Sequence, residues 1–416
     1  MQAKTVSPQF DPSELAEEFG TPLYVIDLDV LESNFRRMSQ ALLTVAKDFK
    51  IFYAVKANPL LAVLRRVATL GGGAEVVSLG EMEAARRARF SPEDVIFNGP
   101  GKSEQEIAAA VEWGVASVNV ESLSELELLV EICKRTSVKA NVGFRINPGV
   151  SARTHGYLQT GRRGSKFGLD MKSFKRALEL AAESELNSPK CVHMHFGSQI
   201  GSASAFRAAC RRLMQFVRSF EVALGRSPEV IDIGGGLGLD YSTGKPYIEP
   251  EVWAGAVIGP LLSSRGWPPS AKLALEPGRS LVAQAGALVM KVLHVKETGE
   301  TRWLIADSGM NDFLRTALYS SKHRIVNASR SSVTRERYFV GGPICESGDV
   351  FGEYYLPRTD QGDLLVLLEA GAYGSCMSSN YNGQPRPATV AVSRGSASLC
   401  ERRESLDDMF ARQVIA

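Results

Sequence analysis

Eight short apolar runs alternate with longer helical patterns through the first two thirds of this 416-residue chain. The runs lie near residues 51–55, 74–77, 94–97, 116–120, 139–146, 190–196, 229–233 and 272–276. Helical patterns separate them, among them residues 60–70, 104–113, 123–133, 174–182 and 206–224. Because helix-length crossovers join parallel strands, this order predicts an α/β fold with a closed (β/α)8 barrel of the TIM type over residues 28–280. A doubly wound open sheet is the competing arrangement, although it rarely needs eight such units.

The pattern of predicted strands and helices changes after about residue 280. Strand-like runs follow one another without long helices between them, at residues 282–295, 302–306, 337–340, 364–369 and 389–392. Such a succession predicts a mostly antiparallel β domain over residues 281–416. The N-terminal segment, residues 1–27, contains a short apolar run from Leu23 to Ile26, and we expect this strand to join the β domain.

Composition and charge exclude several classes of protein. Apolar residues make up 44% and charged residues 23% of the chain, a balance typical of a folded globular protein. The net charge of +2 provides no basic surface for nucleic acid or for a membrane. No apolar run approaches the roughly 18 residues that span a bilayer, and residues 1–12 contain no signal-peptide core.

The cysteines are scattered and form no C-x-x-C pair. This spacing is typical of reduced thiols and argues against a disulfide framework or a zinc site. We therefore expect a cytoplasmic protein without a structural metal, in which one thiol can still be catalytic. The six are Cys133, Cys191, Cys210, Cys345, Cys376 and Cys400.

Lys56 ends the first barrel strand, within the run Ile51–Pro59. Asn58 and Pro59 break the strand directly afterwards. Burial lowers the pKa of a lysine, and a neutral amine is what Schiff-base chemistry requires. The alternative is a lysine whose flexible stem simply reaches solvent.

Polar residues follow the other predicted strands as well, and in a βα barrel function collects at the carboxyl ends of the strands. The residues at these ends are Ser78, Asn98, Gly99, Glu121, Ser122, Arg145, Asn147, His193, His195, Gly234, Gly235, Gly236, Glu276, Gly278 and Arg279. Their joint placement predicts a single site at this end of the barrel.

The triple glycine 234–236 follows the seventh strand. Glycine lets the backbone approach a ligand closely and present its N–H groups, and the loops after strands seven and eight of a barrel commonly bind phosphate. We favour a phosphate site here over the alternative of a tight turn.

His193, His195 and Glu276 admit two interpretations each. The histidines could bind a metal, but no acidic or cysteine set stands beside them in the sequence, so a histidine facing a flat cofactor ring is the better interpretation. A buried Glu276 needs a cationic partner. A protonated pyridine nitrogen would be such a partner and would make the ring an electron sink, whereas a simple ion pair with Arg279 or Lys272 is the alternative.

Several motifs, taken in order along both predicted domains, resemble one enzyme family. They are FYAVKANP, HFGSQIG, DIGGGLG, EPGRS, CESGDVF and EAGAYG, and they span the chain from about Thr21 to the C-terminus. The chain resembles the pyridoxal-phosphate-dependent decarboxylases of the alanine-racemase-like barrel fold, and among these the diaminopimelate decarboxylases. RINPGV, HGYLQTG, SKFG and NDFLRTALY add to the resemblance.

The resemblance implies a set of cofactor-binding residues. Lys56 would form a Schiff base with pyridoxal 5'-phosphate, His195 would stack on the pyridine ring, and Glu276 would pair with its nitrogen. The phosphate would be held by Ser198, Gly234, Gly235, Gly236 and Arg279. Gly278 and Tyr373 would complete the cofactor-binding set.

The resemblance also implies how an amino-acid substrate is bound and protonated. Cys345 would donate the proton after decarboxylation, across the interface of a homodimer whose active sites are shared. The substrate would contact Arg279, Arg315, Tyr319, Glu346 and Tyr373. Arg315 offers a two-point grip on a distal carboxylate, and Glu346 offers a charge for a distal amine. meso-2,6-Diaminopimelate carries both groups, and its decarboxylation would yield L-lysine and CO2.

Four residues depart from the family pattern: Glu75, Pro100, Phe196 and Glu369. Glu75 and Glu369 stand where the family commonly has aspartate, and none of the four removes a catalytic group. Pro100 and Phe196 lie near enough to the predicted site to keep two alternatives open. One is a decarboxylase for another carboxylate-bearing or carrier-linked amino acid, and the other is an inactive cofactor-binding regulator.

Overall fold

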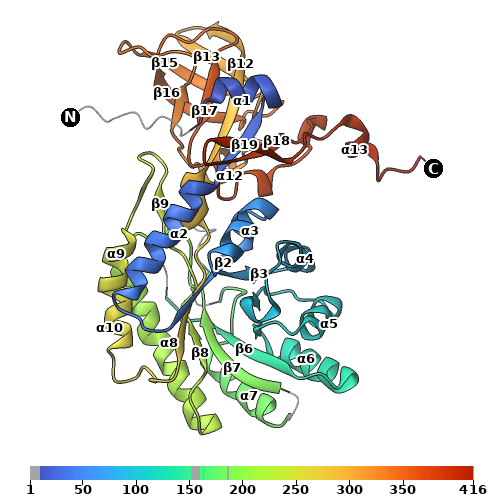
Figure 1. Cartoon of the computed structure of the whole chain (residues 1–416), viewed down its shortest axis with the longest axis vertical. Coiled ribbons are helices and arrows are strands. Elements are labelled where there is room, and N and C mark those ends of the chain that lie inside the picture. The colour runs from blue at the N-terminus through green and yellow to red at the C-terminus, as the bar shows by residue number, and fades with distance from the viewer. Residues whose placement is uncertain (1–9, 151–159, 163, 185–186, 416) are drawn as a thin grey trace. The chain divides into compact units, whose positions relative to one another are not determined.

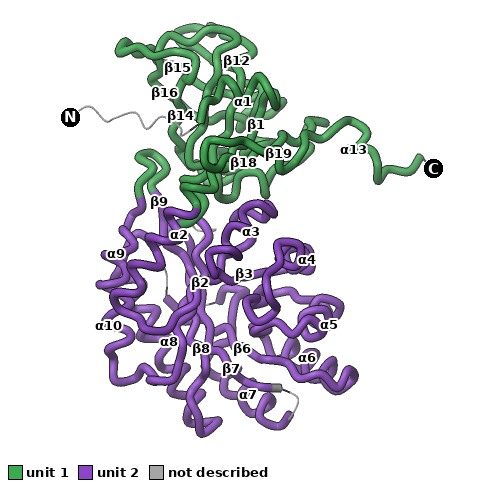
Figure 2. The backbone as a smooth tube through the Cα atoms, in the orientation of Figure 1, with its two compact units in different colours: residues 1–31, 240–245, 281–416 green, residues 32–239, 246–280 purple. Residues whose placement is uncertain are grey.

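The computed structural model describes residues 10–150, 160–162, 164–184 and 187–415. These residues form two compact units, coloured in Figure 2. The barrel unit comprises residues 32–239 and 246–280, and the β unit comprises residues up to 31, 240–245 and 281 onward. Residues 240–245, inside the range predicted for the barrel, are grouped with the β unit. No helix among the described residues is long and apolar enough to cross a membrane.

Eight parallel strands close the barrel unit, and this confirms the predicted fold class. Helices surround the labelled barrel strands in Figure 1. Their order around the barrel follows the chain, and β11 closes it by pairing with both β8 and β2. The strands are β2 (Phe49–Ala54), β3 (Gly73–Val76), β4 (Val95–Phe97), β5 (Ser117–Val120), β6 (Ala140–Ile146), β7 (Asn187–Met194), β8 (Val230–Asp232) and β11 (Lys272–Leu275).

Helix α2 (Leu28–Leu43, in this unit from Glu32 on) precedes the first barrel strand, and the other helices of this unit connect successive strands. The connecting helices are α3 (Leu61–Thr69), α4 (Leu79–Arg87), α5 (Glu104–Trp113), α6 (Leu123–Thr136), α7 (Met171–Ala182), α8 (Ala203–Leu224), α9 (Pro250–Trp253) and α10 (Gly259–Leu262). The sequence patterns did not predict α2 or α4. In α4 the cause is a low apolar content, because only Met82 and Ala85 are buried.

Small polar residues begin the barrel helices α4 to α8. Each accepts a hydrogen bond from a backbone N–H of the first helical turn, which satisfies a donor that has no partner within the helix. These N-caps are Ser78, Ser103, Ser122, Asp170 and Ser202. Ser78 and Ser122 lie two positions past the ends of their strands, β3 and β5, so there the strand end and the helix start lie at the same end of the barrel.

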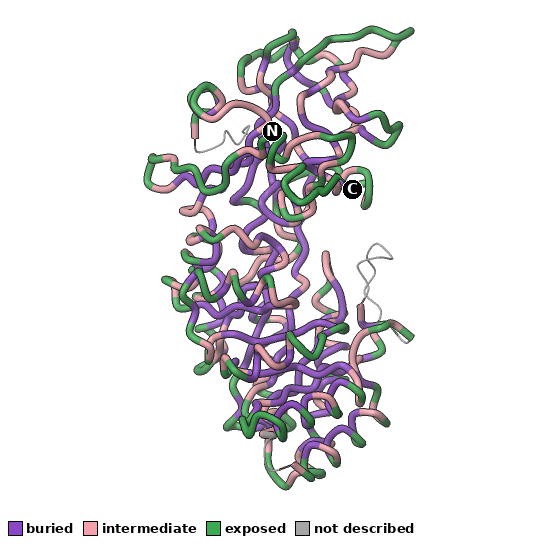
Figure 3. Tube along the Cα trace, turned by 90° about the vertical axis from the view of Figure 1, so that its right-hand side faces the viewer, coloured by how far each residue is buried: buried purple, intermediate pink, exposed green. Residues whose placement is uncertain are grey.

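Aromatic rings pack between the barrel and its helices. Phe144 of β6 lies edge-on to Phe174 of α7, with ring centroids 5.7 Å apart, and Phe174 contacts Phe216 of α8 at 5.2 Å. All three side chains are buried. Figure 3 colours the backbone by burial and shows buried stretches running through the interior, with exposed ones at the periphery. Each such ring removes a large apolar area from water and adds a favourable edge-to-face contact.

The β unit contains a nine-stranded sheet among its described residues. Its strands are β1 (Leu23–Asp27), β12 (Gly286–Thr298), β13 (Thr301–Ala306), β14 (Ile325–Asn327), β15 (Glu336–Gly341), β16 (Val350–Leu356), β17 (Leu364–Leu367), β18 (Ala388–Ser393) and β19 (Ser396–Glu401). Most pairs are antiparallel, and β1–β18 and β13–β15 are parallel. As predicted, β1 joins this sheet, between β12 and β18.

Four short helices accompany the sheet in the chain: α1 (Pro12–Phe19), α11 (Arg279–Val282, in this unit from Leu281 on), α12 (Arg315–Tyr319) and α13 (Leu406–Phe410). The sequence patterns did not predict β14, β16 and β19. In β16 and β19 exposed and half-buried positions predominate, so the apolar signal of a buried strand is weak there.

Candidate active site

Lys56 lies at the carboxyl end of β2, in the single turn Val55–Ala57. Its Nζ atom forms an ion pair with Oε2 of Glu75 on the neighbouring strand β3. The Glu75 side chain is buried, whereas the Lys56 side chain keeps 35% of its surface exposed. The lysine is thus held in place by a buried carboxylate while its amine stays within reach of a small molecule.

The glycine turn 234–236 packs directly against other strand ends. A Cβ atom on Gly235 would overlap the carbonyl oxygen of Glu276, and Gly236 has a φ of +114°, a conformation that L side chains rarely adopt. The N–H of Gly235 points to Nδ1 of His195 at 3.3 Å. The turn is therefore restricted to glycine by packing as well as by conformation.

Arg279 donates a hydrogen bond from Nη2 to the hydroxyl of Ser198, at 3.0 Å. The arginine is buried. Gly278 precedes it and lies against the end of β2, because a Cβ atom there would stand 3.0 Å from Cβ of Ala54 and 2.9 Å from Cβ of Ala57 in the following turn. A guanidinium, a hydroxyl and the backbone N–H groups of the glycine turn are the donors that bind a phosphate group.

Glu276 is buried at the end of β11 and has two close neighbours. Nε2 of His193 lies 3.2 Å from its Oε1 atom, and Nδ2 of Asn98 donates to the same oxygen at 2.6 Å. Burial alone would raise the pKa of Glu276, yet the charges of His193 and Lys56 outweigh burial and hold the pKa well below its usual range. The carboxylate is therefore ionised and available to a cationic ligand.

Lys272 and Arg279, the two cations considered as partners of Glu276, each contact another group. Lys272 lies 3.3 Å from Asp48 at the surface, and Arg279 donates to Ser198. Lys272 begins β11 and Glu276 follows its last residue, so the two side chains lie at opposite ends of the strand.

Acidic side chains do stand beside His193, contrary to the expectation from the sequence. Ligand atoms of His193, Asp232 and Glu276 lie within 4.8 Å of one another. Barrel closure brings them together from β7, β8 and the end of β11. Burial and the charge of Glu276 raise the pKa of Asp232 well above its usual value.

His195 follows β7 and is partly buried. Its carbonyl oxygen accepts a hydrogen bond from the hydroxyl of Thr160 at 3.0 Å. Desolvation and the nearby positive charges of Arg145 and Lys56 lower the pKa of His195 to about 3. The ring is thus neutral near pH 7 and can lie against a flat ligand without adding charge.

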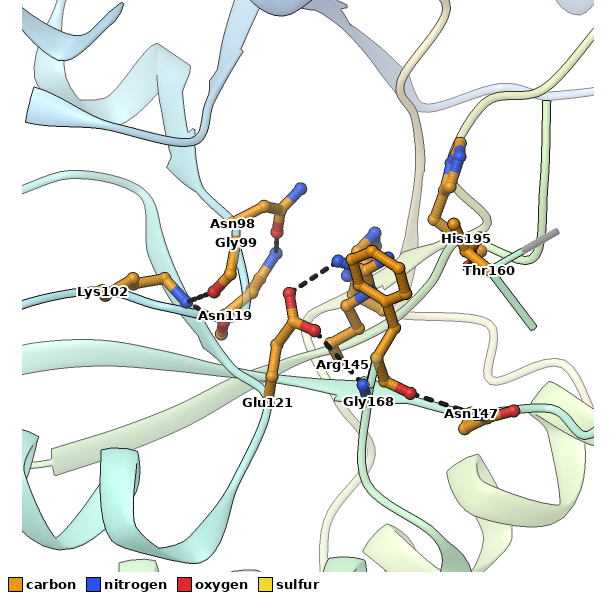
Figure 4. Close-up of polar contacts among 12 residues, drawn as sticks. Asn98, Gly99, Lys102, Asn119, Glu121, Arg145, Asn147, Thr160, Gly168 and His195 are labelled. Carbon is orange, nitrogen blue, oxygen red and sulfur yellow. Dashed lines mark hydrogen bonds and ion pairs between the residues drawn. The ribbon is translucent and has the colours of Figure 1, made fainter. Parts of the chain in front are cut away.

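Two buried cations hold the neighbouring strand ends together (Figure 4). Arg145 of β6 forms an ion pair with Glu121 at 2.6 Å, and the N–H of Gly168 donates to the other oxygen of Glu121. Lys102 donates to the carbonyl oxygens of Gly99 and Asn119, at 2.7 and 2.8 Å. These pairs stiffen the barrel mouth on the side of β4 to β6.

In the β unit, Arg315 begins α12 and is surrounded by tyrosine rings. Its guanidinium carbon lies 4.8 Å from the ring centroid of Tyr241, 5.3 Å from that of Tyr319 and 6.0 Å from that of Tyr373. Arg315 is 2% exposed. Cation–π contacts of this kind hold the guanidinium in one orientation.

Tyr241 is a site residue that the sequence patterns missed. Its ring also stacks on His323, with centroids 4.1 Å apart. It lies in the segment 240–245, which follows β8 in the chain but is grouped with the β unit. No periodic pattern marks such a residue, because its partners Arg315 and His323 are 74 and 82 positions away along the chain.

Cys345 and Glu346 lie on the loop between β15 and β16, and both are exposed. The buried carboxylate of Asp349 shapes this loop by accepting hydrogen bonds from the N–H groups of Ile344 and Met310, at 2.7 and 2.6 Å. Both residues are therefore presented on the surface of the β unit by a loop with a fixed base.

The four departures from the family pattern are accommodated. Glu75 pairs with Lys56, and Glu369 forms an ion pair with Arg324. Phe196 is buried edge-on against Phe206, with centroids 5.2 Å apart. Pro100 follows Gly99, whose backbone Lys102 holds. Of these, Glu75 could have been recognised as a functional residue, because a charge inside the apolar run 74–77 needs a partner.

The predicted site residues thus form two groups. The barrel unit brings together Lys56, His195, Ser198, Gly234, Gly235, Gly236, Glu276, Gly278 and Arg279. The β unit brings together Arg315, Tyr319 and Tyr373, and carries Cys345 and Glu346 on an exposed loop.

Comparisons with known proteins agree with this geometry. Residues 28–283 match the family of the pyridoxal-dependent decarboxylases, in its pyridoxal binding domain. The chain is 39% identical to the diaminopimelate decarboxylase of Methanocaldococcus jannaschii, over 98% of this chain and 94% of that protein. The diaminopimelate decarboxylase of Zymomonas mobilis is 38% identical, over 95% and 93%.

A solved structure resembles the whole chain as well. Diaminopimelate decarboxylase from Helicobacter pylori, complexed with L-lysine, superposes with a TM-score of 0.89 at 34% identity and covers 96% of this chain and 98% of that one. The barrel presents a lysine and a buried carboxylate at one end, and the sequence identities of this size extend over nearly the full length of the chain. The chain therefore belongs to the diaminopimelate decarboxylases within the pyridoxal-dependent decarboxylase family.

Proposed function

We propose that the protein decarboxylates meso-2,6-diaminopimelate to L-lysine and CO2, with pyridoxal 5'-phosphate as its cofactor. The observation that carries this proposal is the pairing of Lys56 with Glu75 at the same barrel end as the ionised Glu276. The family membership supports the same reaction. Two relatives of the chain, from Helicobacter pylori and Methanocaldococcus jannaschii, have solved structures with L-lysine bound.

The barrel residues fit this cofactor. When bound, it supplies an electron sink for the bond pair left by the departing CO2. Lys56 would hold it covalently, and the ionised Glu276 would keep a proton on the ring nitrogen. The neutral ring of His195 would lie against its face, and the phosphate would be bound by the donors of Ser198, Arg279 and the glycine turn 234–236.

The β unit would supply the recognition of the distal end of the substrate. Arg315, held by its tyrosine rings, would bind the distal carboxylate at two points, with help from Arg279 and Tyr319. Glu346 would take the charge of the distal amine. Tyr373 would line the cofactor and the substrate. Together these contacts select an amino acid that carries both a carboxylate and an amine at its far end.

The last step requires a proton on the α-carbon. We propose that the thiol of Cys345 donates it, and that each active site of a homodimer receives this thiol from the partner chain. Exposure of the Cys345 loop supports a role at an interface. We also place the enzyme in the cytoplasm, where the six free cysteines would stay reduced.

A decarboxylation assay tests the proposal. The purified protein with added cofactor is offered the separate isomers of diaminopimelate, and also ornithine, lysine, arginine and glutamate. We expect CO2 release and L-lysine formation from the meso isomer at a rate well above that from the others. Release from another carboxylate-bearing amino acid would reassign the substrate, and a bound cofactor with no release from any of them would indicate a regulator.

A further inference from the structure

Two carboxylates of the barrel site are joined by one amide. Nδ2 of Asn98, at the end of β4, donates to Oε1 of Glu276 at 2.6 Å and to Oε1 of Glu75 at 3.0 Å. β11 and β4 are not neighbours in the barrel, because β2 and β3 lie between them. The contact between Asn98 and Glu276 therefore crosses the mouth of the barrel.

The orientation of the Asn98 amide is set from the opposite side. Nδ2 of Asn119 donates to Oδ1 of Asn98 at 2.7 Å, and the hydroxyl of Ser117 donates to Oδ1 of Asn119 at 2.7 Å (Figure 4 shows the first of these bonds). If the Asn98 amide were reversed, its oxygen would face two carboxylates and its nitrogen would face another donor. Only the observed direction of donation satisfies all the groups of this chain.

This hydrogen-bonded chain is buried and closely fitted. Asn98 is 2% exposed and Asn119 is fully buried. β6 leaves room for the Asn119 carboxamide only because residue 143 is glycine. Buried polar side chains are expensive unless every group is bonded, and a fully bonded set specifies one arrangement of its neighbours.

We infer that Asn98 is a positioning residue that sets the distance between Glu276 and the Lys56–Glu75 pair, and that Asn119 keeps its amide in the required orientation. The inference rests on the proposed function, since Glu276 and Lys56 are the proposed contacts of the ring nitrogen and the reactive carbon of one rigid cofactor. A donor shared by both carboxylates keeps these contacts aligned and reduces the repulsion between the two charges.

The test compares Asn98→Ala, Asn98→Asp, Asn119→Ser and the double variant Asn98→Ala/Asn119→Ser. Each full-length holoenzyme is examined by equilibrium dialysis, for the cofactor dissociation constant, and by the pH dependence of the cofactor absorbance. Asn141→Ala is the matched control, because Asn141 lies on β6 of the same barrel and bonds only a backbone oxygen, that of Val115.

We expect Asn98→Ala to weaken cofactor binding about tenfold or more, as for the loss of a hydrogen bond to a charged group, and to shift the pH dependence of the absorbance. Asn98→Asp should bind more weakly still, because it adds a third carboxylate, and should recover as the pH falls. Asn119→Ser should have a smaller effect in the same direction, and the double variant should resemble Asn98→Ala. The control should match the wild type.

The outcomes separate this inference from the proposed function. If the wild type binds no pyridoxal phosphate, both are wrong. If the wild type binds it and the Asn98 and Asn119 variants keep its affinity and absorbance, only the inference is overturned, even where their thermal stability falls. If Asn98→Ala does not fold, Asn119→Ser decides the question, because it leaves both carboxylates and Asn98 in place.

Discussion

The carboxamide of Asn119 occupies the space beside Gly143 that any other residue would fill. A Cβ atom on Gly143 would overlap Oδ1 of Asn119 and stand 2.5 Å from Oγ of Ser117. Because both neighbours lie on a buried strand, they cannot move aside. Gly143→Ala should therefore lower the free energy of unfolding by about 1–3 kcal/mol, the range for overfilled cores. Urea unfolding measures this, with Gly255→Ala as control, since no atom outside its own chain neighbours lies within 4 Å of the Cβ position at Gly255. Equal effects of the two substitutions would contradict the prediction.

The cofactor should be attached to Lys56. Borohydride reduction of the holoenzyme, followed by peptide mapping, should place the label on this residue, because Glu75 holds its amine at the barrel mouth. Lys102 provides an internal comparison, since its buried amine is occupied by Glu125 and two carbonyl oxygens and should remain unlabelled. A label at any residue other than Lys56 would contradict the proposal that Lys56 binds the cofactor.

Cys345→Ala should keep the cofactor and lose most of the turnover, because the α-carbon would lack its proton donor. Cys400→Ala is the control, as Cys400 is also exposed in the β unit. If the homodimer shares its sites, a mixture of Cys345→Ala and Lys56→Ala proteins should regain part of the activity, since one mixed dimer contains one intact site. Failure to regain activity after verified subunit exchange would argue against sharing.

Arg315 should determine the preference for a distal carboxylate. Loss of its two-point contact in Arg315→Ala should cost about 1.5–3 kcal/mol, or one to two decades in kcat/KM for meso-diaminopimelate. Residual activity on lysine, which has no distal carboxylate, should fall much less. Arg315→Lys should restore only part of the loss, because an ammonium group binds at one point. An unchanged ratio of the two activities would mean that Arg315 is structural.

Glu81 should make stability depend on pH. Its carboxylate accepts a hydrogen bond from the N–H of Val77, while burial and the charge of Glu75 raise its pKa to about 7. The folded protein therefore binds this proton more tightly than the unfolded chain, and stability is lost as the pH rises from about 4.5 to 7.

Glu81→Gln removes this titration. We compare the free energy of unfolding of the variant with that of the wild type at each pH, and this difference should favour the variant by about 1–3 kcal/mol more at pH 8 than at pH 5. Thermal unfolding at the two values of pH measures the difference. Glu83→Gln on the same helix makes the same change of charge at an exposed position and should show no such trend. A difference between Glu81→Gln and the wild type that does not vary with pH would refute the prediction.

Much of the barrel could be predicted because its signals are local. A short apolar run indicates each strand, and the spacing of apolar residues indicates each helix. Because the strands are parallel, the polar residue that follows each strand lies at the functional end of the barrel. Lys56, Glu276 and the glycine turn 234–236 were located in this way, from their neighbours in the chain. Helix α4 and strands β16 and β19 were missed because few of their side chains are buried, so their apolar pattern is weak.

The sequence by itself determined the order of strands and helices, the chemistry at the strand ends and the family. Only the tertiary structure decided which groups meet. Glu276 contacts His193 and Asn98 instead of the cations near it in sequence, and Tyr241 lies beneath Arg315 although 74 positions separate them in the numbering. The physical reason is that barrel closure and sheet packing join residues from distant segments, whereas periodicity and turn signals report only on each residue's immediate neighbours.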